Sequence, residues 1–142
     1  DGMPEMYLAA GESLFGEYRW STYDILVMPP SFPYGGMENP RMAFVTPCLL
    51  TGDRSLGDVI AHEIAHCWFG NLVTNANWSE FWLNEGFTMF AQRRITDVVH
   101  GKAFTALEAM TGRKILEDDV NDLGEEHVLT RLRCPIEAGV DP

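Results

Sequence analysis

The sequence lacks any apolar run as long as a membrane span, and its first residues form neither a basic leader nor a signal-peptide-like stretch. Basic residues are also scarce: ten lysines and arginines stand against twenty-one acidic residues, giving a net charge of −11 at pH 7. Such a chain has little with which to neutralise phosphates. We therefore expect a partner that is neither nucleic acid nor membrane, whereas cationic substrates are compatible with this charge.

Cysteine is rare as well. Cys48, Cys67 and Cys134 are an odd number and have no metal-ligand spacing. We expect them to be reduced thiols within the core, which favours a cytoplasmic protein. A secreted protein stays an alternative.

The length of the chain predicts one domain or part of one. The 142 residues are 46% apolar, which is enough to build a core. The first residue is Asp1 and not methionine. We therefore expect a segment of a larger gene product, and the sequence alone leaves its oligomeric state unknown.

The most informative pattern is the stretch 62–66, His-Glu-Ile-Ala-His, followed after eighteen residues by Glu85. This HExxH-x18-E pattern is typical of zinc hydrolases. His62 and His66 are four residues apart and would share one helix face, so both imidazoles can reach one ion. Glu85, on a second helix, would be the third ligand, leaving a fourth position open as in catalytic zinc sites. A bare HExxH can also arise by chance on an amphipathic helix with solvated side chains.

Glu63 is expected to be the catalytic base and not a ligand. Its direction differs from that of His62 by about 100° around the helix. This places its carboxylate beside the metal-bound water, where a general base is needed.

Periodicity and turn residues predict an α+β fold that is mostly helical, with a small strand region near the N-terminus. We expect the strand 23–28 to be largely buried, because it has few polar residues. Helices are expected at 4–16, 55–70, 79–99 and 102–116, and strands at 23–28 and 42–46. The segment 31–40 is expected to be a loop. The chain beyond 118 is also expected to be irregular, with one short helix at 128–132.

The loop 31–40 contains three prolines and the pair Gly35-Gly36. Adjacent glycines allow a backbone to approach another group closely, because no Cβ intervenes. One interpretation is a substrate cradle in which Glu38 holds a positive charge. The other is an ordinary tight turn with a solvated glutamate.

Four stretches carry a resemblance to a known family: 29–40, 62–66, 70–78 and 81–95. Through them the chain resembles the gluzincin family of zinc aminopeptidases over nearly its whole length. The stretch 81–95 and residues 139–142 are similar to the branch that removes basic residues. The resemblance implies a partial thermolysin-like catalytic core, with residues 1–142 forming a fragment of the catalytic domain that lacks the family's N-terminal β-domain and C-terminal helical domain.

The resemblance also assigns roles. It implies one zinc ion bound by His62, His66 and Glu85, with Glu63 as the base. In such enzymes the residues matching Gly35, Gly36 and Met37 lie along the substrate, and the match to Glu38 binds the free α-amino group. The family's oxyanion-stabilising tyrosine falls outside this chain, so we expect the 142 residues alone to have weak activity or none.

These observations predict a zinc-dependent aminopeptidase acting on peptides with a free N-terminus. A preference for N-terminal Arg or Lys is implied by the resemblance. Two alternatives stay open: a bifunctional epoxide hydrolase and aminopeptidase, and a truncated zinc-binding scaffold without catalytic activity.

Overall fold

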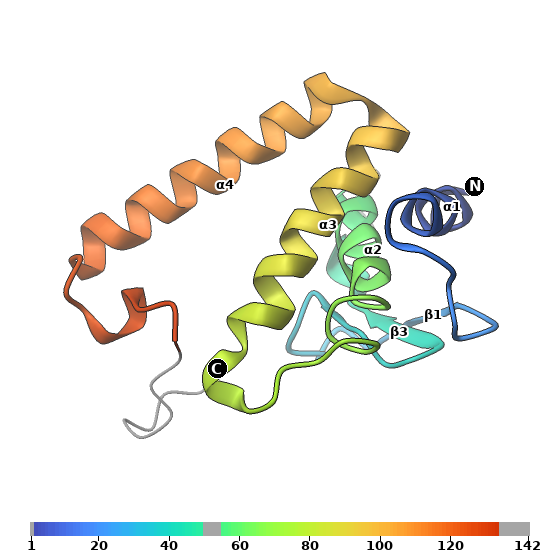
Figure 1. The fold of residues 1–142 in the computed structure, drawn as a ribbon, viewed down its shortest axis with the longest axis horizontal. Helices are drawn as coiled ribbons and strands as arrows, with labels where there is room; N and C mark the ends of the chain where they lie inside the picture. Colours follow the sequence, from blue (N-terminus) through green and yellow to red (C-terminus); the bar gives the residue numbers. More distant parts are fainter. Residues whose placement is uncertain (1, 50–54, 134–142) are drawn as a thin grey trace.

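The computed structural model describes residues 2–49 and 55–133. In this part of the chain, helices pack with one small sheet near the N-terminus (Figure 1), which confirms the expected mixture of helix and strand. The helices are α1 (Met3–Phe15), α2 (Ser55–Ala65), α3 (Trp82–His100) and α4 (Lys102–Leu123). The strands are β1 (Asp24–Val27), β2 (Gly36–Met37) and β3 (Met42–Val45), and short 3-10 turns cover Pro47–Leu49, Trp78–Glu80 and Val128–Thr130.

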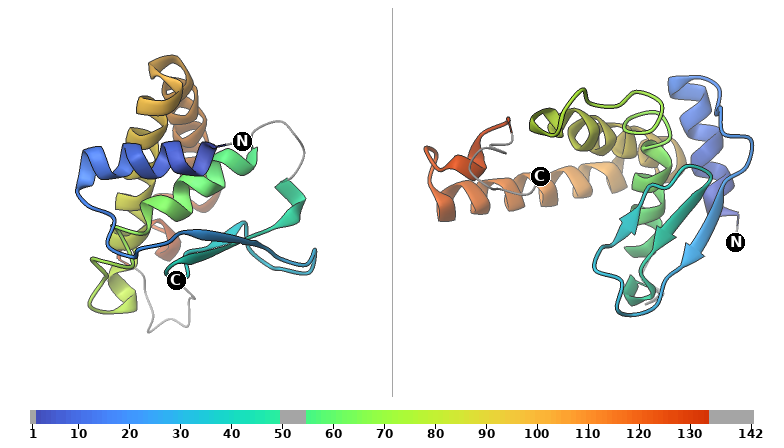
Figure 2. Two further views of the ribbon diagram at one scale, coloured as in Figure 1. Left: turned by 90° about the vertical axis from the view of Figure 1, so that its right-hand side faces the viewer. Right: turned by 90° about the horizontal axis from the view of Figure 1, so that it is seen from below.

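Helix α2 is the central element of the fold. It contacts α1 and α3 as well as strands β2 and β3. Figure 2 shows it between the sheet and α1. Its residues Ala61, Ile64 and Ala65 are fully buried. The apolar surface removed from water around α2 is therefore what fixes the helix that carries the HExxH pattern.

The sheet has the order β1-β3-β2, with β3 parallel to β1 and antiparallel to β2. The expected loop 31–40 thus contains a strand, in which Gly36 pairs with Val45. The prediction that the first strand is largely buried is wrong, since Leu26 is 43% exposed and Val27 is 49% exposed. The reason is that β1 lies at the sheet edge while α2 packs on β2 and β3.

Helix α1 is joined to the turn after α2 by a close fit at Gly11. A Cβ at this position would lie 2.7 Å from the indole of Trp68, so only glycine leaves room for that ring. The indole N–H of Trp68 donates to the Gly16 carbonyl at 3.0 Å. The indole N–H of Trp20 donates to the Cys67 carbonyl at 3.1 Å. The N-terminal segment therefore holds the chain immediately after the HExxH pattern.

Two helices end at other residues than expected. Helix α2 ends at Ala65 instead of near residue 70, because its last turn tightens and the Trp68 N–H bonds to the Ala65 carbonyl. Helix α4 continues to Leu123 rather than residue 116. Ion pairs between residues four apart, Arg113 with Glu117 and Lys114 with Asp118, carry the helix into the acidic run.

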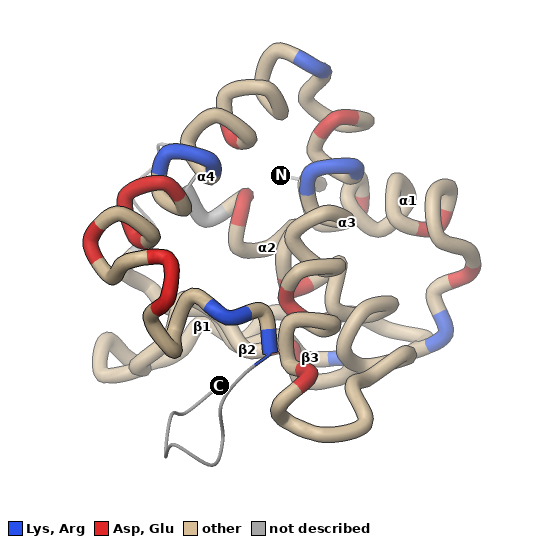
Figure 3. The backbone as a smooth tube through the Cα atoms, turned by 60° about the vertical axis from the view of Figure 1, so that its left-hand side comes forward, with Lys and Arg blue, Asp and Glu red and all other residues tan. Residues whose placement is uncertain are grey.

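The acidic residues 117–119 and 122 lie on the second half of α4 (Figure 3), and all four are exposed, as expected for solvated side chains. None of the residues of α4 is buried within the described part of the chain. No helix of this part is long and apolar enough to cross a membrane.

The cysteines differ from one another. Cys67 is buried, as expected for a core thiol, but Cys48 is exposed. Cys134 and the stretch 139–142 lie outside the described residues.

Candidate functional site

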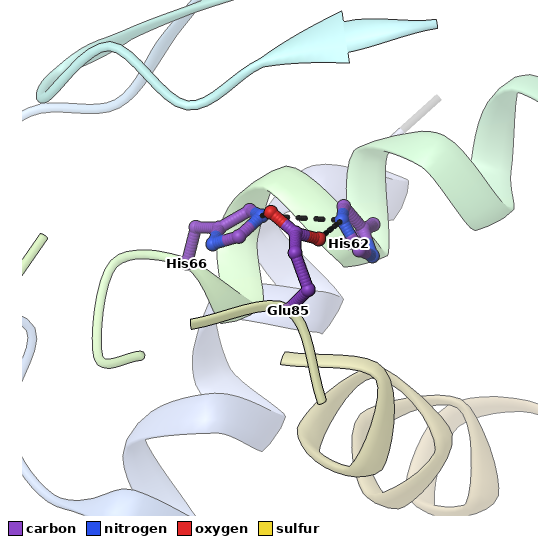
Figure 4. A group of neighbouring side chains, drawn as sticks. All are labelled: His62, His66 and Glu85. Carbon is purple, nitrogen blue, oxygen red and sulfur yellow. Dashed lines mark hydrogen bonds and ion pairs between the residues drawn. The ribbon is translucent and has the colours of Figure 1, made fainter. Parts of the chain in front are cut away.

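Side chains from α2, from the turn that follows it and from α3 bring their donor atoms together (Figure 4). His62 lies on α2, His66 directly follows its last residue, and their Nε2 atoms are 3.1 Å apart. Glu85, in the first turn of α3, spans both: its Oε2 is 3.3 Å from His62 Nε2 and its Oε1 is 3.5 Å from His66 Nε2. Two imidazoles and one carboxylate therefore converge on a single point and could hold a metal ion.

The opposite nitrogen of each imidazole is held by a hydrogen bond. His66 Nδ1 lies 2.9 Å from the Phe69 carbonyl and 3.1 Å from Thr88 Oγ1. His62 Nδ1 lies 3.0 Å from Gln92 Oε1. Since a carbonyl oxygen only accepts, each Nδ1 carries a proton, and in the neutral form of each imidazole Nε2 presents its lone pair to the convergence point. In the charged form, Nε2 of His62 instead donates to Glu85.

Thr88 and Gln92 are site residues that the sequence analysis missed. They follow Glu85 by three and seven positions, so all three lie on one face of α3. Both are polar and buried. Polar residues at helical spacing from a proposed ligand were the available signal.

Glu63 faces the same region with an unpaired oxygen. The residue is 4% exposed, and Oε2 has no hydrogen-bond partner among the described residues. Burial raises the pKa of Glu63 to about 8; the charge of His62 opposes this rise, and the carboxylates of Glu38 and Glu85 add to it. A carboxyl group with this pKa can both accept and donate a proton near neutral pH.

The three donor residues also have shifted pKa values. Burial lowers the pKa of His62, but its hydrogen bond to Glu85 and nearby carboxylates outweigh burial, so the net shift is upward. For His66 burial prevails and the pKa falls. Burial alone would raise the pKa of Glu85, yet the hydrogen bond from His62 and both imidazole charges lower it.

The strand side of the site is shaped by the absence of a side chain at Gly36. A Cβ at Gly36 would lie 2.0 Å from Glu63 Oε1. At Gly35 the nearest atom to such a Cβ would be a methyl group of Val59, at 3.9 Å. The backbone of β2 therefore lies directly against the Glu63 carboxylate, and only one of the two glycines is required for it.

All the residues predicted to form the site line one cleft of about 760 Å³. The Glu38 side chain is 18% exposed, and its Oε1 lies 4.0 Å from His66 Nδ1. The Asn71 amide donates to the main-chain carbonyl of Glu38 at 2.6 Å, which ties this segment to the turn after α2. The predicted residues in the cleft wall are Gly35, Gly36, Met37, Glu38, His62, Glu63, His66 and Glu85.

Comparison with known proteins places this geometry in a family context. Residues 2–137 match the model of the peptidase family M1 domain. The chain is 67% identical to aminopeptidase B of Mus musculus over 141 residues, which is 99% of this chain and 22% of that protein. It is 50% identical over 138 residues to leucine aminopeptidase 2 of Sclerotinia sclerotiorum, covering 97% of this chain and 22% of that protein.

A solved structure has the same fold. The structure of yeast LTA4 hydrolase in complex with bestatin superposes with a TM-score of 0.89 at 45% identity, covering 97% of this chain and 22% of that one. The chain thus spans about a fifth of the length of these relatives.

Proposed function

Since the chain belongs to peptidase family M1, we propose that it carries the metal-binding and proton-transfer residues of a zinc-dependent aminopeptidase. The observation that carries this proposal is the convergence of donor atoms from His62, His66 and Glu85 beside the buried Glu63 carboxylate, whose Oε2 has no hydrogen-bond partner among the described residues. A protein without chemistry to perform has no physical need for that carboxylate. This argues against the alternative of a zinc-binding scaffold without activity.

The donor set fits zinc. Tetrahedral zinc with bonds of about 2.0–2.1 Å holds its ligand atoms about 3.3 Å apart. The two imidazole Nε2 atoms are 3.1 Å apart, His62 Nε2 is 3.3 Å from Glu85 Oε2, and His66 Nε2 is 3.5 Å from Glu85 Oε1, so the two carboxylate oxygens each lie at about this separation from one imidazole. Three protein ligands also leave the open position that a catalytic zinc site requires.

When bound there, zinc would polarise the scissile carbonyl and lower the pKa of a water molecule. Glu63 would be the general base of the reaction, accepting a proton from the attacking water and donating it to the leaving amine. Its burial supports this role, because a carboxylate in a dry site interacts strongly with nearby charge. Gly36 keeps the space beside this carboxylate free.

We propose that the substrate is a peptide with a free N-terminus. Glu38 holds the α-amino group, and Gly35, Gly36 and Met37 lie along the peptide. A largely buried carboxylate needs a cationic partner, and the N-terminal ammonium group is one that every peptide offers. Glu38 lines the same cleft as the zinc ligands, which supports removal of one residue at a time.

A preference for N-terminal Arg or Lys is supported by the 67% identity to aminopeptidase B and by the net charge of −11. The similarity to yeast LTA4 hydrolase favours a second candidate, hydrolysis of a fatty-acid epoxide in the same cleft. We further propose that the chain is part of a thermolysin-like catalytic domain within a longer cytoplasmic protein.

The experiment that tests the proposal measures zinc content and turnover in the full-length protein. We expect about one zinc ion per molecule and release of a reporter from Arg-, Lys- and Ala-linked substrates that stops when a chelator is added. Turnover should be fastest with Arg. The His62→Gln variant should lose the metal, while the control His127→Gln, which alters a histidine at the 3-10 turn after α4, should keep it. A folded protein without zinc, or turnover that the chelator leaves unchanged, would contradict the proposal.

A further inference from the structure

A chain of polar side chains links His62 to helix α4. Gln92 Oε1 lies 3.0 Å from His62 Nδ1, and Gln92 Nε2 lies 3.5 Å from Glu108 Oε1. The second oxygen of Glu108 accepts a hydrogen bond of 2.7 Å from Thr96 Oγ1. Glu108 belongs to α4, so the link joins the proposed zinc site to a helix that contributes no ligand.

We propose that Glu108 is a positioning residue for His62, acting through the side-chain amide of Gln92. This inference rests on the proposed function. Glu108 selects the orientation of the amide, and the amide selects the tautomer and orientation of the imidazole.

The reason lies in the symmetry of an amide group. The oxygen and nitrogen of Gln92 have nearly the same shape, so packing alone does not choose between the two orientations. In the flipped orientation an NH2 group would face His62 Nδ1 and require it to accept, which moves the ring proton to Nε2. A protonated Nε2 cannot bind a metal ion. Because a carboxylate only accepts, Glu108 holds the NH2 side of Gln92 toward itself.

His66 needs no such selection. Its Nδ1 contacts the main-chain carbonyl of Phe69, whose direction is set by the backbone and which can only accept. The two histidines of one motif are therefore restrained differently. The tautomer of His66 is fixed by a main-chain carbonyl, with Thr88 as a second partner of the same nitrogen, and that of His62 depends on side chains of α3 and α4.

Glu108 is well placed for this task. Thr96 is fully buried and holds one carboxylate oxygen, while the other oxygen points to Gln92. Within the described residues, Glu108 forms no ion pair with a basic side chain, so its charge is available to the amide. The residue lines a second cavity of about 340 Å³, to which α2 contributes Asp58 and α3 contributes Met89 and Arg93. The apolar part of the lining, which includes Met89, Phe104 and Leu107, suits a leucine substitution.

The test compares zinc affinity, by chelator competition, in four variants of the full-length protein. Glu108→Leu removes the acceptor, and we expect zinc to bind about tenfold more weakly, the lower end of the effect of outer-shell partners of metal ligands. Glu108→Gln should restore affinity to within about threefold, because its carbonyl can accept from Gln92 while its NH2 donates to Thr96 Oγ1. Thr96→Val, which frees one side of Glu108, should fall between these two.

The matched control is Glu117→Leu, which makes the same charge change at an exposed position of the same helix. It should bind zinc like the wild type. The thermal midpoint of each metal-free variant separates a loss of folding from a loss of positioning. Equal affinity of Glu108→Leu and wild type, an equal loss in Glu117→Leu, or no rescue by Glu108→Gln would overturn the inference. Absence of zinc from the wild type would instead overturn the proposed function.

Discussion

The helical wall of the cleft, formed by α2 and α3, holds its functional groups through side-chain hydrogen bonds, whereas the strand wall at residues 35–38 places main chain directly against them. On the helical wall, Gln92 and Thr88 orient the two imidazoles. On the strand wall, Gly36 has no Cβ, and a Cβ at this position would collide with Glu63. The helical wall therefore depends on the side chains that are present, and the strand wall depends on the side chain that is absent at Gly36.

The sharpest test of the helical wall is Glu63→Gln, which keeps the shape of the side chain but removes its basicity. We expect turnover to fall by about a thousandfold, within the range of general-base contributions. Zinc content should stay at the wild-type level, because Glu63 does not belong to the group formed by His62, His66 and Glu85; it shares a second group that could hold a metal ion with Glu38 and His66. Loss of the metal in this variant would contradict its assignment as base, and steady-state kinetics with metal analysis decides the matter.

The strand wall is tested by Gly36→Ala. The added methyl group would overlap the Glu63 carboxylate, and displacing a reacting group by about 1 Å can cost about a hundredfold in rate. The matched control is Gly35→Ala, where the nearest atom is 3.9 Å from the new Cβ. We expect kcat of the control to stay close to that of the wild type, with any effect confined to KM, because Gly35 is proposed to lie along the peptide but a Cβ there would not contact Glu63. If both alanine variants lose the same activity, the strand wall does not act through Glu63.

Glu38→Gln tests the one charged group of the strand wall. Removing one partner of a largely buried charge pair costs at least about 2 kcal/mol, so KM for peptides with a free N-terminus should rise by about thirtyfold or more. Peptides with an acetylated N-terminus are poor substrates that lack the partner ammonium, and the variant should treat them like the wild type. Unchanged KM for the free peptides would exclude Glu38 as the anchor of the amine.

The smallest effect is expected at Gly86, directly after Glu85 on the helical wall. A Cβ there would meet no atom within 4 Å among the described residues, so this glycine is not needed for close packing near the site. Gly86→Ala should therefore stabilise α3 by about 0.5–1 kcal/mol. Chemical denaturation measures the change in the free energy of unfolding. A loss of stability would mean that this position contacts a part of the protein beyond the described residues.

The sequence predicted the elements that have strong local signals. The HExxH spacing placed His62 and His66 on one helix face, and the structure brings Glu85 to the same point. The helix boundaries at Gly16 and Gly101 were predictable because glycine is favoured directly after a helix end, where φ is often positive. In the structure these two glycines have φ values of 97° and 84°. These features depend on residues close to one another along the chain.

The remaining features depend on contacts between distant residues. The exposure of β1 follows from its place at the sheet edge, which no local pattern indicates. Strand β2 has two residues and owes its existence to pairing with β3. The link from His62 to Glu108 crosses three helices, so its members were unrecognisable before α3 and α4 were placed side by side.

The contact between Gly11 and Trp68 links the cleft to helix α1, which lies outside it. The sequence of α1 therefore affects the position of the chain that follows the HExxH pattern. Trp68 follows His66 by two residues, and its indole fills the notch that Gly11 leaves in α1. The indole N–H of Trp20 donates a hydrogen bond to the Cys67 carbonyl in the same turn. Natural variation at positions 11 and 20 should therefore be as restricted as variation in the metal-binding motif, although neither residue lines the cleft. Helix α1 therefore fixes the position of the C-terminal end of α2 by packing against the residues that follow it.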